Sequence, residues 1–290
     1  MAWALRPAAA RRVSRASAVT TSLLIPCFNE ADGLRRLETE LWSVVSDLSV
    51  TRVVDVVFVD DGSRDDTPQL LAALADRWSG RGVATTVVTH PTNRGLGSAL
   101  RSGFAAARGD IIVSTDSDAT YPFAEIPRLL EILERGADVV TASPYHPDGR
   151  VANVPAYRLI LSRGASFLYR VALRRDVHTY TSIFRAYRRE VLATVGFDAA
   201  GFLGATELLV NAILAGFRVA EFPTVLHARR FGSSKAKLAR TTRAHLGFLA
   251  HLAAMRIRGG TRISRGRTPV LPSARHASGP LKMRPSEGAQ

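Results

Sequence analysis

The chain has 290 residues, of which 46% are hydrophobic and 22% are charged, and this is the balance of a globular protein with a sizeable core. Its net charge of +14 comes from the ends, because residues 1–18 carry +4, residues 236–258 carry +5, residues 259–290 carry +5, and residues 19–235 sum to zero. This distribution argues against a basic nucleic-acid groove in the main domain and favours a negatively charged surface, such as anionic lipid, as the partner of the two ends of the chain.

Between residues 19 and 145, apolar runs rich in β-branched residues alternate with helical patterns. Such alternation is typical of right-handed βαβ units, and it predicts an α/β fold with a mostly parallel central sheet and helices on both faces. The predicted segments are, in order, TSLLIP and 31–48, VVDVVFVD and 66–78, VATTVVTH and 95–107, DIIVSTD and 123–135, and ADVVTAS.

The pattern changes after residue 145. A turn containing Pro and Gly (144–155) is followed by predicted helices near 156–172, 186–195 and 204–215 and by two short strands within 217–228. We expect this half to pack against the first sheet, so that residues 19–235 form one domain with a cleft between its halves.

Residues 236–258 predict a basic amphipathic helix, with Leu246, Leu249 and Leu252 at helical spacing and only Lys, Arg and His among its charged or titratable residues. Such a helix can lie in a membrane interface, and packing on its own domain is the alternative. Residues 1–18 and 259–290 are predicted to be disordered basic segments, for which a solvated tail without a partner is the simplest interpretation.

The compartment follows from what the chain lacks. Cys27 is the single cysteine, so no intramolecular disulfide can form, and a reducing compartment fits. The N-terminus has no secretory apolar core, and no stretch approaches the roughly 18 apolar residues of a membrane span. We therefore expect a cytoplasmic protein that is peripheral on the inner face of a membrane.

Asp116 and Asp118 follow the fourth predicted strand, where a loop can turn both carboxylates toward one point. Two hard oxygen ligands with open coordination positions suit Mg²⁺ or Mn²⁺, which would also take up substrate phosphate. The spacing alone is a weak signal, since acidic turns are common.

Three further motifs lie at strand ends in a fixed order: PCFNE, VDDGSRDDT and NRGLGSALRSG. Together with the D-x-D pair they resemble the family 2 glycosyltransferases with the GT-A fold, and among these the dolichol- and polyprenol-phosphate sugar transferases. The resemblance spans residues 22 to 122. It implies a nucleoside-diphosphate sugar as donor and a divalent metal, Mg²⁺ or Mn²⁺, at Asp116 and Asp118.

The resemblance also implies which residues bind the nucleotide sugar. Strand-end carboxylates accept hydrogen bonds from base N–H and ribose hydroxyl groups. The alternative is that Asp61, Ser63 and Asp65 cap the next turn and helix. The matching positions here are Pro26, Phe28, Glu30, Val59, Asp60, Asp61, Asp116, Ser117 and Asp118.

The segment NRGLGSALRSG lacks the G-x-G-x-x-G spacing and follows the third strand, which disfavours a dehydrogenase. In the family this segment packs beneath the nucleotide, so close backbone packing is implied for Gly95 and Gly97. Downstream, RRFGSSK resembles the R-x-x-G-x-S-K loop, which assigns Arg229, Ser234 and Lys235 to the departing diphosphate. A basic surface turn is the alternative.

The acceptor side resembles the family in part. Arg158 and Ser162 match the residues that hold the acceptor phosphate. The chain departs from the pattern at three places: Pro144 replaces an Arg, Ile183 a Gly, and Thr120 a Gln or Ser that assists the metal.

The acceptor decides the mechanism. A polyprenyl or dolichyl phosphate is already anionic, so inverting displacement needs no general base, and Asp118, Arg229 and Lys235 suffice as the catalytic set. A hydroxyl acceptor on a glycan or small molecule would need a base, for which Glu207 is the candidate, and a helix N-terminal acid is its alternative role. A catalytically weakened sugar-nucleotide scaffold is the third hypothesis, motivated by Pro144 and Thr120.

Overall fold

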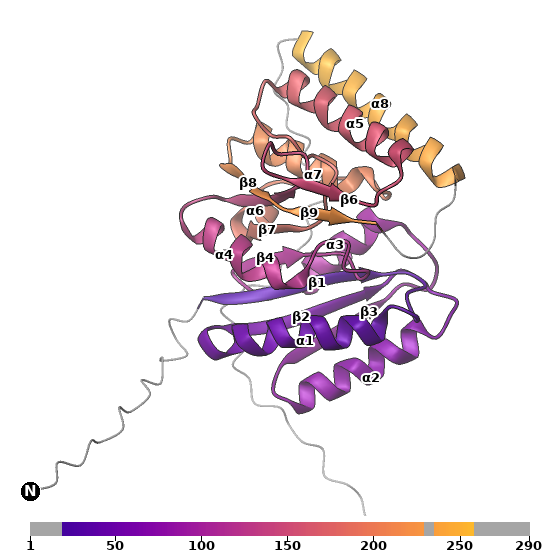
Figure 1. Ribbon diagram of the computed structural model, residues 1–290, viewed down its shortest axis with the longest axis vertical. Coiled ribbons are helices and arrows are strands. Elements are labelled where there is room, and N and C mark those ends of the chain that lie inside the picture. Colours follow the sequence, from indigo (N-terminus) through magenta and orange to yellow (C-terminus); the bar gives the residue numbers. More distant parts are fainter. Residues whose placement is uncertain (1–18, 229–234, 258–290) are drawn as a thin grey trace, which may run out of the picture.

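The computed structural model describes residues 19–228 and 235–257, and within them a central sheet carries helices on both faces (Figure 1). This confirms the predicted α/β class. The strands of the sheet are β1 (Thr20–Cys27), β2 (Val53–Asp60), β3 (Ala84–Thr89), β4 (Ile111–Ser114), β5 (Val139–Ser143), β7 (Arg185–Arg188) and β8 (Val219–Pro223).

The sheet order is β3-β2-β1-β4-β7-β5-β8. All neighbouring pairs are parallel except the two that β7 makes with β4 and β5. Since β1, β2 and β4 run in the same direction, the loops that follow them meet at one edge, with Cys27 directly opposite Asp60. A binding site beyond the carboxyl ends of the strands is therefore built from these loops.

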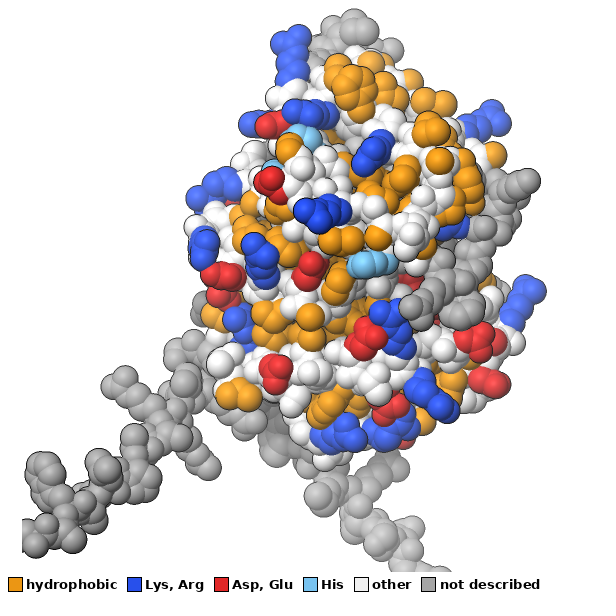
Figure 2. All heavy atoms as spheres, viewed as in Figure 1, with side chains coloured by type: hydrophobic (Ala, Val, Ile, Leu, Met, Phe, Trp, Pro, Cys, Tyr) orange, Lys and Arg blue, Asp and Glu red, His pale blue; other side chains and the backbone are white. Residues whose placement is uncertain are grey.

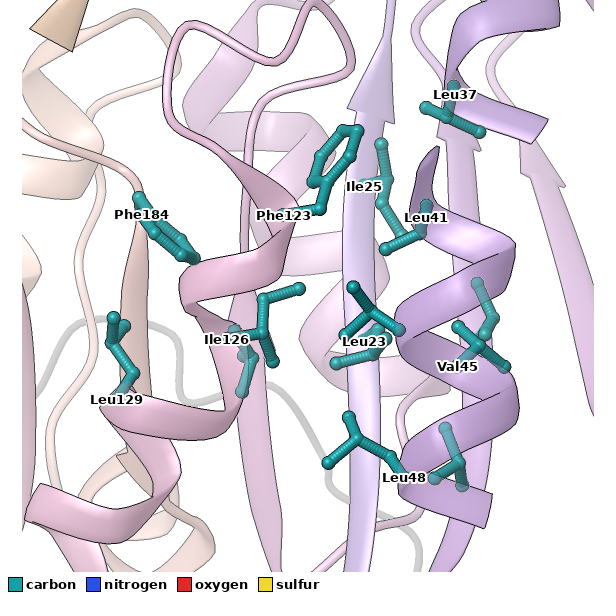
Figure 3. Close-up of a cluster of buried hydrophobic side chains, with 14 of the residues drawn as sticks. Leu23, Ile25, Leu37, Leu41, Val45, Leu48, Phe123, Ile126, Leu129 and Phe184 are labelled. Atoms are coloured by element: carbon teal, nitrogen blue, oxygen red, sulfur yellow. The ribbon is translucent and has the colours of Figure 1, made fainter. Parts of the chain in front are cut away.

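Two hydrophobic layers hold the helices to the sheet, because β1 alternates its side chains between the faces. Leu23 and Ile25 face α1, as Figure 3 shows, while Leu24 belongs to the layer on the other face. One layer is covered by α1 (Leu34–Thr51), α2 (Thr67–Gly80) and α4 (Ile126–Glu134), which follows the short turn η1 (Phe123–Glu125). The other is covered by α3 (Leu96–Ala106), α6 (Arg189–Thr194) and α7 (Leu203–Leu214).

The prediction of a helix near 186–195 was wrong in its first part. Residues Arg185–Arg188 form the antiparallel strand β7, and only Arg189–Thr194 are helical. Arg185 is fully buried, and its guanidinium donates to the side chain of Thr141 and to the carbonyl oxygens of Tyr180 and Ala205. An arginine in a central strand gives no apolar signal, so the strand is invisible to the sequence pattern.

The predicted turn at 144–155 also contains a strand. β6 (Arg150–Ala152) pairs in parallel with β9 (Val225–His227), and the two form a separate ribbon. The pairing joins segments about 75 residues apart, so local sequence carries no signal for it.

The last described helix, α8 (Lys235–Ile257), lies beside α5 (Ala156–Leu173), and both run across the top of the view in Figure 1. Leu252 is buried, and Phe248, Leu249 and Met255 pack against the second hydrophobic layer. α8 therefore packs on its own domain through these four residues, whereas Leu246 is 55% exposed.

None of the helices within residues 19–228 and 235–257 combines the length and the hydropathy that crossing a bilayer requires. The predicted disordered segments, 1–18 and 259–290, lie outside the described residues, as do Arg229 and Ser234. Lys235 begins α8, and its side chain also lies outside the described part.

Candidate active site

The loops after β1 and β2 are joined into one unit by hydrogen bonds. Asn29, in a left-handed conformation (φ 53°), donates its backbone N–H to Ser63 Oγ at 2.9 Å, and its own side-chain Oδ1 accepts from the N–H of Arg64 at 2.9 Å. The N–H of Glu30 donates to Thr67 Oγ1 at 2.8 Å, at the start of α2. These bonds fix the predicted donor-binding residues of both loops relative to one another.

Asp61 is almost fully buried, and its carboxylate is surrounded by protein donors. Oδ1 accepts from His90 Nδ1 at 2.7 Å and from the N–H of Arg94 at 2.9 Å. Oδ2 accepts from Asn93 Nδ2 at 3.1 Å and from the N–H of Gly95 at 2.8 Å. Asp61 thus anchors the segment that leads into α3, a role that neither of the interpretations made from the sequence included.

His90 is a site residue that the sequence reasoning missed. It is buried at the end of β3, and its Nε2 lies 2.9 Å from Ser102 Oγ, so that it links α3 to Asp61. The sequence did offer a signal for His90: it is the polar residue that ends the segment VVTH, at the same edge of the sheet as the acidic loops.

Asp60 differs from its neighbour. It is fully buried; Oδ1 accepts from the N–H of Ser63 at 3.0 Å, and Oδ2 has no hydrogen-bond partner within the described part of the chain. Burial, with the carboxylates of Glu30 and Asp60 nearby, raises the pKa of the Cys27 thiol. A buried carboxylate oxygen without a donor is unfavourable, and Oδ2 of Asp60 has the capacity to accept a further hydrogen bond.

Asp65 stabilises the turn before α2, whose N-cap residue, Asp66, has no side-chain cap hydrogen bond. Asp65 Oδ1 accepts from the N–H of Thr67 at 3.1 Å, where α2 begins, and its Oδ2 accepts from the N–H of Ala31 at 3.2 Å. The acids of this motif therefore have different roles: Asp65 stabilises the turn before α2, Asp61 anchors a loop, and Asp60 keeps one oxygen without a donor among the described residues.

The D-x-D loop turns its two carboxylates toward Thr120. Thr120 Oγ1 donates to Asp116 Oδ2 at 3.3 Å and its N–H donates to Asp118 Oδ1 at 3.1 Å, while Ala119 takes the positive φ of a tight turn (50°). Both aspartates are half-buried. Thr120, one of the departures from the family pattern, therefore still contacts the pair.

These carboxylates suit a hard divalent cation. No group of three His, Cys, Asp or Glu side chains able to hold a metal occurs within residues 19–228 and 235–257. Two carboxylates with further positions left for water and phosphate are the arrangement that Mg²⁺ accepts, and Mn²⁺ prefers similar oxygen ligands.

The second half of the chain returns to this loop. The N–H of His227, at the end of β9, donates to the carbonyl oxygen of Thr120 at 2.9 Å. Asp118, His227 and Ala228 together line a hollow of about 480 Å³ that is closed on its other side by α1. The residue that follows Ala228 is Arg229, so the chain enters the predicted diphosphate loop beside Asp118.

Glu207 lies in α7 and is nearly buried. Its Oε2 accepts from the N–H groups of Asp198 and Ala199, at 3.1 and 2.9 Å. The loop that contains Ala199 packs on the start of α3. A Cβ added to Gly97 would lie only 2.0 Å from the carbonyl oxygen of Ala199, which confirms the close packing predicted for this glycine. Glu207 therefore holds a loop in place.

The predicted acceptor residues lie in the first two turns of α5. Arg158 is half-buried, and Ser162 Oγ lies 2.6 Å from Thr181 Oγ1. The Arg163 guanidinium stacks 5.3 Å from the centre of the Tyr145 ring, and burial raises the pKa of Tyr145. Arg163 and Tyr145 thus form a stacked pair, and Tyr145 directly follows Pro144 in the chain.

The family model for glycosyl transferase family 2 matches residues 22–196. The chain belongs to this family. It is 33% identical over 218 residues to a dolichol-phosphate mannosyltransferase of Pyrococcus furiosus, covering 74% of this chain and 59% of that protein. It is 35% identical over 222 residues to a polyprenol monophosphomannose synthase of Mycolicibacterium smegmatis, covering 74% of this chain and 80% of that protein.

Among solved structures, this family 2 chain is similar to glucosyl-3-phosphoglycerate synthase from Mycobacterium tuberculosis, solved with Mn²⁺, UDP-glucose and phosphoglyceric acid. The TM-score is 0.60 at 22% identity, with 83% of this chain and 82% of that chain covered. The similarity confirms the predicted GT-A-type fold.

Proposed function

We propose that this family 2 glycosyltransferase is a metal-dependent, inverting enzyme that transfers a sugar from a nucleoside-diphosphate sugar to polyprenyl or dolichyl phosphate at the cytoplasmic face of a membrane. The observation that carries the proposal is the D-x-D loop. In this loop Thr120 donates hydrogen bonds to both aspartates, and its carbonyl oxygen accepts one from the N–H of His227 at the end of β9. The names of the relatives support the acceptor, since they include undecaprenyl-phosphate sugar transferases.

In this proposal the donor lies across the carboxyl edge of β1, β2 and β4. Asp60 accepts from the base or ribose through Oδ2, with Pro26, Phe28, Glu30 and Val59 around it. Asp116 and Asp118 hold the cation, with Ser117 between them. Bound Mg²⁺ or Mn²⁺ would stabilise the negative charge that develops on the diphosphate. Arg229, Ser234 and Lys235 bind the same phosphates, which lowers the barrier to their departure.

The acceptor approaches from the α5 side. Arg158 and Ser162 bind its phosphate through charge-assisted hydrogen bonds and orient one oxygen toward the anomeric carbon. The phosphate attacks as an anion, so no side chain has to remove a proton, and displacement from the opposite face inverts the configuration.

The proposal is tested with purified full-length protein, a panel of UDP- and GDP-sugars, Mg²⁺ or Mn²⁺, and polyprenyl phosphate in detergent. We expect lipid-linked sugar with one donor, and loss of product when EDTA removes the cation. Metal-dependent nucleotide binding without transfer to any acceptor would instead support the scaffold hypothesis, and transfer to a hydroxyl compound alone would support the alternative enzyme.

The variant Glu207→Gln separates the two acceptor classes. Both backbone N–H groups that Glu207 binds donate to one atom, Oε2, so the glutamine oxygen can replace it and the fold should be kept. For a phosphate acceptor we expect kcat within about threefold of wild type, because no base is needed. For a hydroxyl acceptor a base would be lost, and kcat would fall by about a hundredfold or more. Thermal unfolding of the variant serves as the control for structure.

A further inference from the structure

A row of exposed apolar side chains runs along α5. Ile160 is 69% exposed, Phe167 63%, Leu168 44% and Val171 57%. Positions seven, eight and eleven residues apart fall on one side of a helix, so these four form a single stripe, which we call the α5 apolar face. Figure 2 shows hydrophobic side chains gathered at the top of the view, where α5 and α8 lie in Figure 1.

The opposite side of α5 is the one that packs. Tyr169 is fully buried, and its hydroxyl lies 3.1 Å from Nδ1 of His245 on α8. Burial lowers the pKa of His245, which favours its neutral form in this contact. The inward side of α5 is thus matched to α8 and the second core, whereas the α5 apolar face is left outward.

Cations line the edge of the α5 apolar face. Arg163 and Arg170 are exposed, and their spacing of seven residues places them along one border of the stripe. Arg174 is also exposed and directly follows the last residue of α5. Neither α5 nor α8 contains an acidic residue, and the nearest acid in sequence, Asp176, pairs with Arg170. The surface therefore combines an apolar centre with a positive rim.

We propose that the α5 apolar face enters the head-group region of an anionic membrane leaflet. An apolar stripe bordered by arginines binds such a leaflet by burial of hydrocarbon and by attraction to lipid phosphates. A second copy of the chain is a poorer partner, because two cationic rims would repel each other. This places the membrane contact on α5, while Phe248, Leu249, Leu252 and Met255 of α8 are used for packing.

The inference rests on the proposed function in one respect: Arg158 and Ser162 belong to the same helix. Arg158 and Ser162 lie on the side of α5 away from the stripe, so with α5 in the interface they would stand within about one helix diameter (~10 Å) of the lipid phosphates. A lipid acceptor could then be reached without leaving the membrane.

The test is flotation of the full-length protein with vesicles of phosphatidylcholine, with and without phosphatidylglycerol. We expect binding that requires the anionic lipid and that weakens about tenfold for Ile160→Asp or Phe167→Asp, because each change removes one buried apolar side chain and adds a repelled charge. The matched control is Leu70→Asp, which changes a 41% exposed leucine of α2 and should bind as wild type.

Three outcomes would overturn the proposal: no binding by the wild type, equal binding by Phe167→Asp and wild type, or a dimer that Phe167→Asp dissociates. Sugar transfer to polyprenyl phosphate in detergent is measured in parallel. If sugar transfer persists without vesicle binding, the membrane contact through α5 is wrong and the proposed function stands. If the protein binds vesicles but transfers no sugar, the proposed function is wrong and the membrane contact stands.

Discussion

Asp118→Asn is expected to lower kcat/KM for sugar transfer by about a hundredfold or more, because the variant loses one of two anionic ligands that would hold the cation against the diphosphate. The asparagine oxygen can still accept the N–H of Thr120, so the loop should keep its turn. The loss should appear together with a higher Mn²⁺ concentration for half-maximal activity, which a defect in folding alone would not produce.

The control for this variant is Asp47→Asn, which removes an exposed carboxylate from α1 and changes the net charge by the same amount. It should leave both kcat/KM and the Mn²⁺ requirement as they are. Unchanged activity in Asp118→Asn would show that the metal assignment is wrong. An equal fall in both variants would mean that charge in general, and not this position, matters.

Asp61→Asn is expected to destabilise the protein by about 2–4 kcal/mol in the absence of any ligand. Each oxygen of the buried carboxylate accepts two hydrogen bonds, so the amide group of asparagine must direct its own N–H groups at two donors. The measurement is urea unfolding with and without nucleotide.

Asp60→Asn is the matched comparison, one residue away and equally buried. Its Oδ1 can keep the bond from Ser63, and its amide nitrogen would replace an oxygen that has no donor among the described residues. We expect stability within about 1 kcal/mol of wild type and nucleotide-sugar affinity about tenfold weaker. If instead Asp60→Asn unfolds readily and Asp61→Asn only loses donor affinity, the roles assigned to the two acids are reversed.

The resemblance stated from four short motifs led to the correct family and fold. These motifs lie at strand ends, and three of the strands that precede them, β1, β2 and β4, are apolar runs whose burial is indicated by local sequence. The predicted helices of the first half correspond to α1, α2, α3 and α4 with shifts of a few residues at their ends. Local pattern is sufficient there because each strand is followed by the helix that covers it.

The second half depended on distant partners. β7 is a strand because β4 and β5 lie on either side of it, and its buried Arg185 is tolerated because carbonyl oxygens from residues 180 and 205 accept its hydrogen bonds. The sequence around it, FRAYRREV, looks helical by itself. The segment around β6 looks like a turn by itself, and its partner β9 is far along the chain.

Sequence alone determined the class of fold, the edge of the sheet where the acidic loops gather, and the identity of Asp116 and Asp118 as a pair, since periodicity and spacing are local properties. Tertiary structure decided what each side chain contacts. Asp61 binds His90 and the loop before α3, and one oxygen of Asp60 has no donor among the described residues. The apolar face of α5 is turned outward, while Phe248, Leu249, Leu252 and Met255 of α8 pack inward. The reason is physical, because hydrogen-bond satisfaction and burial depend on which distant segments come together, and spacing along the chain does not encode that directly.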